Sequence, residues 1–174
     1  MVTVGPNNPG TAYNTSLSGG TNWVNLGALF TSNDTRGSVQ SLTGATTNYA
    51  TANNFGFSIP SGARINGILV EWEKGWTGFG SARDNQVRIL KNGSIGNQDK
   101  AVVGFFAGAD AYVSYGGATD LWNETWTPAQ IGSTGFGALL SGTFPGNATI
   151  RLDHVRITVY YDLGVNMKTS TKYW

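Results

Sequence analysis

Turn-forming residues recur along the whole chain, and this feature limits the possible folds most strongly. The 174 residues include 25 Gly, together with 49 Asn, Ser or Thr. Gly, Asn and Ser favour turns and caps, and Thr also fits strands, whereas the good helix formers Glu, Lys, Gln and Met are scarce. Because 40% of the residues are hydrophobic, the chain can still build a core and is not of the disordered type. We therefore expect an all-β domain with many turns.

Alternating apolar and polar residues mark the expected strands. The clearest strand covers 65–73, where Ile68, Val70 and Trp72 share one face and Glu71 and Glu73 share the other. Asn92-Gly93 is the preferred dipeptide of a two-residue type I′ hairpin turn. The other strands that we predict cover residues 23–30, 36–42, 49–59, 87–91, 94–95, 109–115, 120–126 and 148–161, and Phe136, Ala138 and Leu140 alternate in the same way.

Two features depart from plain strands. In 148–161, the apolar residues Ile150 and Leu152 are at even positions, but Val155 and the later ones are at odd positions. In a regular strand these two sets would lie on opposite faces, so we predict a β-bulge near Asp153-His154. Thr127-Pro128-Ala129-Gln130 has the residues of a capping box with Pro at the first helical position. This motif predicts at most one short helical turn, near 127–131.

Many short strands joined by turns predict a two-sheet antiparallel sandwich, jelly-roll-like, with a closed barrel as the second choice. We expect one β-sandwich domain over residues 12–163. The breaker-rich residues 1–11 are expected to form an N-terminal arm. Residues 164–174 show no period and are expected to form a C-terminal extension, disordered in a lone monomer unless it pairs with a neighbouring chain.

The composition excludes several classes of function. Cysteine is absent and His154 is the only histidine, so disulfides, thiolate chemistry and histidine metal clusters are excluded. A net charge of +1 with 12% charged residues argues against nucleic-acid binding. No apolar run approaches the ~20 residues that span a membrane, and we expect no signal peptide. We predict no cofactor, no metal and no catalytic residue, and hence no enzyme.

The few chemical motifs favour structural interpretations. Glu71 and Glu73 project from the same strand face, as in a solvated surface, rather than from opposite sides of a bond. His154 next to Asp153 has no nucleophile-elbow serine to serve. The sequence from Gly78 to Arg83 begins like a phosphate-binding loop but precedes a strand instead of a helix.

Aromatic side chains give the best binding signal. Trp76 and Phe79 lie on a glycine-rich loop at 75–80, and Tyr173 and Trp174 end the chain. We predict these four as partner-binding residues, either against protein or as a platform on which a sugar ring stacks. For Trp72, Trp122 and Trp126, the alternative is that they fill the core.

Four segments taken together resemble a known domain family: 8–12, 54–63 running into 65–68, 120–122 with 126–129, and 153–161. They are similar to a β-sandwich domain that recurs in tailed-phage virion structural proteins, both capsid decoration proteins and tail-associated proteins. The resemblance spans roughly residues 5–162. It implies structural or decoration work on a virion and supplies no catalytic residues.

We therefore expect a non-enzymatic virion structural protein, most specifically a capsid decoration (cement) protein that bridges neighbouring shell subunits. Its partners would be the major capsid protein or other virion proteins, and it would assemble as a homo-oligomer, with a trimer as our guess. It would be made in the host cytoplasm and located in the virion. The alternative is a carbohydrate-binding module, or a phage receptor-binding or tail component that binds a glycan.

Overall fold

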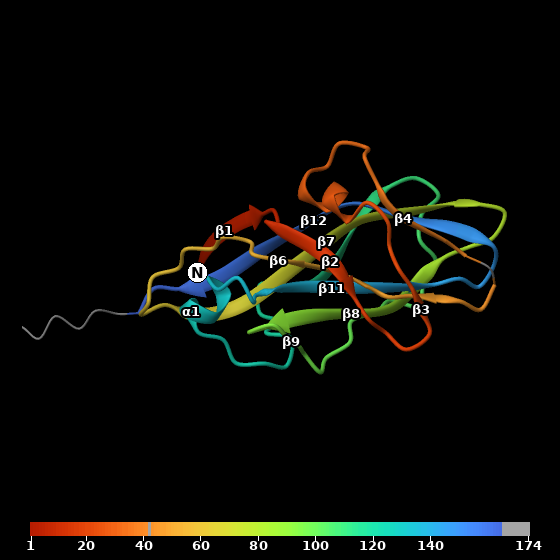
Figure 1. Cartoon of the computed structure of the whole chain (residues 1–174). Coiled ribbons are helices and arrows are strands. Elements are labelled where there is room, and N and C mark those ends of the chain that lie inside the picture. Colours follow the sequence, from red (N-terminus) through yellow and green to blue (C-terminus); the bar gives the residue numbers. More distant parts are fainter. Residues whose placement is uncertain (42, 165–174) are drawn as a thin grey trace, which may run out of the picture.

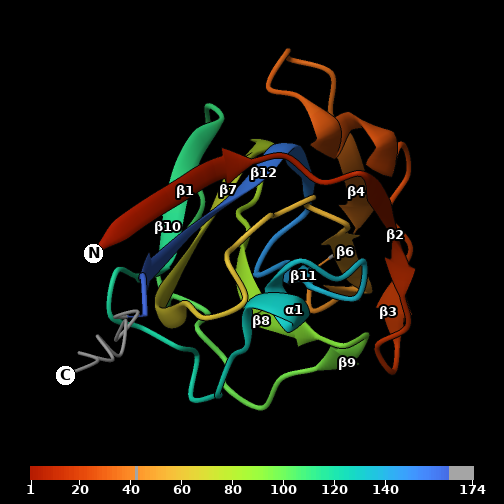
Figure 2. The ribbon, with the colours of Figure 1, turned by 90° about the vertical axis from the view of Figure 1, so that its left-hand side faces the viewer.

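Two β-sheets face each other in the computed structural model, which describes residues 1–41 and 43–164 (Figures 1 and 2). Sheet A consists of β1 (Val2–Asn7), β12 (Ala148–Asp162), β7 (Arg64–Gly78), β10 (Ala111–Gly117) and β4 (Gly37–Ser41). Sheet B consists of β2 (Thr11–Thr15), β6 (Tyr49–Asn53), β11 (Gly137–Thr143), β5 (Thr46–Thr47), β3 (Gly20–Thr21), β8 (Arg83–Lys91) and β9 (Ser94–Ile95).

The predicted fold class is confirmed. The strand pairs are antiparallel apart from the short parallel pairing of β3 with β5. Along the chain the strands pass repeatedly from one sheet to the other, as in a jelly roll. The predicted helical turn is α1 (Pro128–Ile131), and its capping box between Thr127 and Gln130 is present.

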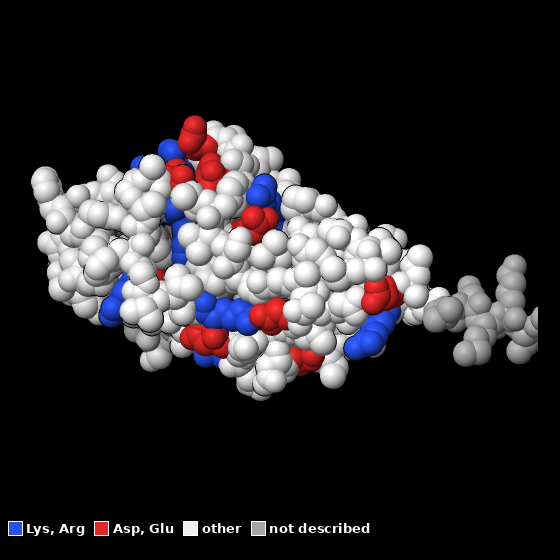
Figure 3. Space-filling view, turned by 180° about the vertical axis from the view of Figure 1, so that it is seen from behind, with Lys and Arg blue, Asp and Glu red and all other residues white. Residues whose placement is uncertain are grey.

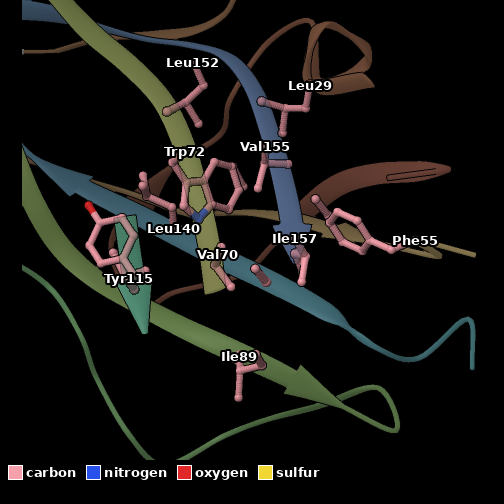
Figure 4. Packing of buried hydrophobic residues seen from close by; sticks show 14 of the residues in the cluster. Leu29, Phe55, Val70, Trp72, Ile89, Tyr115, Leu140, Leu152, Val155 and Ile157 are labelled. Carbon is pink, nitrogen blue, oxygen red and sulfur yellow. The ribbon is translucent and has the colours of Figure 1, made fainter. Parts of the chain in front are cut away.

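The long strands β7 and β12 form the centre of sheet A and supply much of the core. Ile68, Val70 and Trp72 of β7 point inward, as their period predicts, and all three are fully buried. Figure 4 shows Val70 and Trp72 in the interior. Val155 and Ile157 of β12 lie beside them in the close-up. Across the interior, sheet B contributes inward side chains such as Leu140 and Ile89.

The predicted bulge in β12 is confirmed. The register with β7 shifts between Leu152 and His154, so Leu152 and Val155 both reach the core although they differ in parity. The Asn92-Gly93 turn is confirmed as well. Both residues have positive φ, 51° and 78°, as a type I′ turn between β8 and β9 requires.

Two of the predicted strands are wrong, and the predicted strand 49–59 is a strand only over β6 (Tyr49–Asn53), because Asn54 and Gly56 adopt positive φ. Leu26–Phe30, within the predicted strand 23–30, is a 3₁₀ helix (η1) that starts after Asn25 in the left-handed conformation and buries Leu26 and Leu29. Residues 120–126 contain no strand, because Trp122 and Asn123 both adopt positive φ. There the Trp122 Nε1–H donates to Ile68 O at 3.1 Å, which holds the indole in the core.

The segment that we expected to be an N-terminal arm adds a strand to its own molecule. β1 pairs with the end of β12, with Val2 opposite Tyr161 and Val4 opposite Val159. The N-terminal ammonium also contacts Asp162 at 2.8 Å. Of the predicted C-terminal extension, only residue 164 lies within the described residues.

Candidate binding surface at one end of the sandwich

Two connections between strands meet at the end of the sandwich that is opposite the last described residue. The β7–β8 and β11–β12 connections lie side by side there, because Gly78 pairs with Ala148 and Thr143 pairs with Arg83. This end, called the apical end below, lies on the right in Figure 1, where β7 ends and β12 begins. The C-terminal end of β12 pairs with the start of β7 at the other end of the molecule.

Phe79 stands at the tip of the apical end. Its side chain is 106% exposed, which is full exposure for a large apolar residue. The preceding Gly78 has φ of 115°, a conformation that residues with a Cβ rarely adopt, and this turn lets the chain leave β7. Phe79 borders a hollow of about 500 Å³ whose polar lining comes from Gln40, Ser41, Asn147 and Thr149.

A second apolar segment lies at the same end. Val103 is 87% exposed and Phe105 is 64% exposed. The segment is fixed against the start of β8, because the Phe106 N–H donates to Ala82 O at 2.8 Å and Phe105 forms a bridge with Arg83. We call Phe79, Val102, Val103 and Phe105 the apical patch. Single exposed apolar residues are common on proteins, but several at one end indicate a contact surface.

Of the four residues predicted to bind a partner, Phe79 lies on this surface. Phe79 is exposed and follows the end of β7. Trp76 was predicted on a loop but lies within β7 (Arg64–Gly78), where it is half-buried against the core and its backbone N–H donates to Ala107 O at 3.1 Å. Tyr173 and Trp174 lie outside the described residues. Val103 and Phe105 were missed, because residues 101–107 have no strand period and their position depends on contacts with distant parts of the chain.

Trp72, Trp122 and Trp126 are structural. Trp72 and Trp122 are fully buried. Trp126 is half-buried, with its ring edge-on to Phe136 at a centroid distance of 5.3 Å and the ammonium of Lys91 above it. These residues fill the sandwich, as the core interpretation in the sequence analysis predicts.

A wider polar hollow of about 850 Å³ borders Asp120, Asn123 and Glu124. Both of its carboxylates are engaged in ion pairs, Asp120 with Lys100 at 2.6 Å and Glu124 with Lys91 at 3.0 Å. The carboxylates of this hollow are therefore already neutralised within the protein.

The carboxylates on the outer face of sheet A do not form a hydrolytic pair. Glu71 makes a bidentate contact with Arg156, at 2.8 and 3.1 Å, and this contact raises the pKa of Arg156. The space-filling view shows the same pattern more widely, with sparse blue and red groups lying next to one another (Figure 3). Within residues 1–41 and 43–164, no group of three or more His, Asp or Glu residues is placed to hold a metal ion.

Asp153 and His154 do not act as a dyad either. The Asp153 carboxylate accepts the backbone N–H groups of Asn33 and Asp34. His154 instead contacts the Tyr112 hydroxyl and the Asn8 side chain. The carboxylate that precedes His154 in the sequence therefore caps a loop and does not orient the imidazole.

A buried polar cluster near the apical end was also missed by the sequence analysis. Lys74 Nζ lies 2.5 Å from Asp84 Oδ1, and their side chains are 1% and 0% exposed. The Tyr115 hydroxyl donates to Asp84 Oδ2 at 2.7 Å and also contacts Lys74 Nζ. The sequence does indicate that Lys74 points inward, because it continues the alternation of Val70 and Trp72 on the same face of the strand.

Burial controls the protonation of this cluster. Desolvation lowers the pKa of Lys74, and the negative charge of Asp84 opposes this effect. Desolvation raises the pKa of Tyr115, and Asp84 raises it further, so the phenol keeps its proton. The ring of Phe106 lies 4.1 Å from Lys74 Nζ and closes the cluster on one side.

Comparisons with known proteins add little to this description. No family model matches the sequence, and no curated protein matches it. One solved structure, described as "CBM4 structure and function", is similar to 76% of this chain over 86% of its own length, at 14% identity with a TM-score of 0.38. This similarity is too low to indicate a ligand. Within the part of the chain that the structure describes, no helix has the length and apolar character to cross a bilayer.

Proposed function

We propose that this protein is a non-enzymatic structural protein that binds another protein through its apical end, and that a virion shell is its setting. The exposure of the apical patch carries the proposal. An apolar ring such as Phe79, fully exposed at a tip, loses contact with water only when a partner covers it. The resemblance to tailed-phage sandwich domains supports the virion setting, with the major capsid protein or another virion protein as partner.

The physical role follows from mass action. Each copy that buries Phe79 and Phe105 in a groove between shell subunits stabilises the assembled shell over its separated subunits. Aromatic residues at the centre of an interface commonly supply much of its binding free energy. Several copies on one shell, alone or as the homo-oligomer that we propose, would add these contributions over the particle.

Binding to particles tests the proposal. The proposal predicts a major capsid gene in the gene neighbourhood of this protein. Shells assembled from that capsid protein would be sedimented with the wild type and with the double variant Phe79→Ser/Phe105→Ser. We expect the double variant to bind at least about tenfold more weakly, because each lost aromatic contact at an interface centre costs on the order of 1–2 kcal/mol.

The matched control is Ile95→Ser. Ile95 is also an exposed apolar residue, 39% exposed, but it lies on β9 and pairs with Leu90, far from the apical end of β8. We expect this variant to bind like the wild type. Equal binding by the apical double variant and the wild type would refute the proposal.

A glycan-binding role is the second candidate, and the hollow beside Phe79 favours it. Gln40 and Asn147 supply amides there, and Ser41 and Thr149 supply hydroxyl groups next to an exposed aromatic ring. This combination offers one stacking surface and several hydrogen-bonding groups, which is the chemistry that a sugar ring requires. Trp76 is less suited to the platform than Phe79 because it packs against the core.

Two variants separate the candidates on a glycan array and on shells. Gln40→Ala removes a polar group of the hollow and leaves Val103 and Phe105 unchanged, so it weakens sugar binding only. Val103→Ser/Phe105→Ser removes apolar surface outside the hollow, so it weakens protein binding only. No glycan signal from the wild type would exclude the sugar role.

A further inference from the structure

The buried contact between Lys74 and Asp84 joins the two sheets. Lys74 belongs to β7 of sheet A and Asp84 to β8 of sheet B, and their side chains meet in the interior between the sheets. Tyr115 of β10 reaches the same point from sheet A. An amine and a carboxyl group are thus held together where water is largely excluded.

An ordinary ion pair is a costly arrangement at such a place. Removing an ammonium and a carboxylate from water costs several kcal/mol for each ion, and their attraction offsets that cost only in part. Transfer of one proton from Lys74 to Asp84 gives a neutral amine beside a neutral carboxylic acid, which removes both charges. A neutral amine is also a nucleophile, whereas an ammonium group is not.

The remaining contacts of Asp84 are arranged as a nucleophilic attack requires. Oδ1 faces Lys74 Nζ at 2.5 Å. Oδ2 accepts the Tyr115 O–H at 2.7 Å and the Val102 N–H at 3.1 Å. Two donors on one oxygen polarise the carboxyl carbon and stabilise the negative charge that forms on that oxygen when an amine adds.

We propose that Lys74 and Asp84 condense spontaneously to an intramolecular isopeptide bond that ties sheet A to sheet B. The reaction is favoured by proximity, because two groups held in contact and oriented react as if at a very high local concentration. The proposal concerns a covalent modification of the scaffold and does not depend on the partner bound at the apical end.

The reaction balances without any further reactant. One proton moves from the Lys74 ammonium to Oδ1, and the Nζ lone pair then attacks Cγ of Asp84 while Oδ2 takes the negative charge. A second proton moves from Nζ to Oδ1, the Cγ–Oδ1 bond breaks, and Oδ1 leaves as water. The product is a neutral amide with one hydrogen on Nζ, and its Oδ2 keeps the hydrogen bonds from Tyr115 and Val102.

Intact mass spectrometry of the full-length wild-type protein tests the proposal directly. We expect a mass lower by one water molecule than the sequence requires, together with a branched tryptic peptide. In that peptide the chain remains uncut after Lys74, and residues 65–83 are joined to residues 84–88. A succinimide at an aspartate would lose the same mass, but trypsin would still cut after Lys74.

Three variants complete the experiment. Lys74→Met and Asp84→Ala each remove one reacting group, so both are expected at their full sequence mass. Tyr115→Phe keeps the ring and removes one donor from Oδ2, so it is expected to condense more slowly, with both masses visible in a time course. Wild-type protein that keeps its full mass and is cut after Lys74, even after days of incubation, would overturn the proposal without reference to any variant.

Discussion

The Tyr112 hydroxyl lies 2.8 Å from Nδ1 of His154 on the outer face of sheet A. The other ring nitrogen, Nε2, lies 3.1 Å from Oδ1 of Asn8. Because the Asn8 oxygen only accepts, Nε2 carries the hydrogen and Nδ1 accepts from Tyr112, which is the neutral form of the ring. The bulge in β12 places His154 on this face, so the chain just after β1 is held to sheet A by a neutral imidazole.

The buried imidazole predicts a pH dependence of stability. Burial lowers the pKa of His154 below its ordinary value of 6.5, although the nearby Glu73 opposes the shift. Between the lowered pKa and 6.5 the unfolded chain binds more protons than the folded protein, so the free energy of unfolding falls as the pH decreases. The stabilisation is complete above about pH 7 and is lost progressively below about pH 6.5. Urea unfolding at several pH values between about 7.5 and 5.5 measures it.

His154→Gln is the control for this prediction. Glutamine does not titrate, so the slope in this window is expected to disappear even if the variant is less stable overall. If the free energy of unfolding depended on pH as strongly in His154→Gln as in the wild type, His154 would not be the cause of the pH dependence.

Asp153 predicts a second effect at the bulge. Its buried carboxylate accepts the N–H of Asn33 at 3.4 Å and of Asp34 at 3.1 Å, and so fixes the loop before β4. Asp153→Ala leaves both donors without this acceptor and is expected to lower the free energy of unfolding by about 2 kcal/mol. Asp153→Asn keeps one acceptor oxygen and is expected to lose less. Equal stability of the alanine variant and the wild type in urea would exclude this capping role.

The alternation of apolar residues and the identity of the turn residues were enough to predict much of the fold. The alternation around Trp72, the change of parity at Asp153 and the Asn92-Gly93 turn each specify local geometry directly. The two wrong strands lie where specific contacts override propensity. At Trp122, a hydrogen bond to the backbone of a distant strand and a positive φ determine the conformation, and neither is visible in the local pattern.

The site was less predictable than the fold. Phe79 could be selected because glycines around an aromatic residue indicate an exposed loop. Phe105 could not, since its place beside Arg83 depends on a contact between separate segments. Lys74 shows the same limit: its inward parity is visible in the sequence, but its partner Asp84 can be recognised only after β7 and β8 are placed in opposite sheets.

Gly67 gives a third prediction, which tests the packing of β7 against the segment after β10. A Cβ at Gly67 would lie 2.2 Å from the carbonyl oxygen of Gly117 and 2.4 Å from that of Ala118. Because both atoms belong to the backbone, relief requires the strands to shift, and Gly67→Ala is expected to cost about 2–3 kcal/mol. Gly117→Ala is the matched control, since its Cβ would meet nothing within 4 Å. Similar unfolding midpoints for the two variants would show that this contact is not as close as described.

The aromatic residues of the 75–80 segment give the last prediction, because the structure assigns them different roles. Trp76 is half-buried against the core, so Trp76→Ala is expected to cost about 2 kcal/mol, less than the 3–5 kcal/mol typical of a fully buried Trp. Phe79 is fully exposed, so Phe79→Ala is expected to change the free energy of unfolding by less than about 0.5 kcal/mol. Urea titrations of both variants measure the difference. If Phe79→Ala destabilised the isolated protein as much as Trp76→Ala, its ring would be part of the fold and not a surface reserved for a partner.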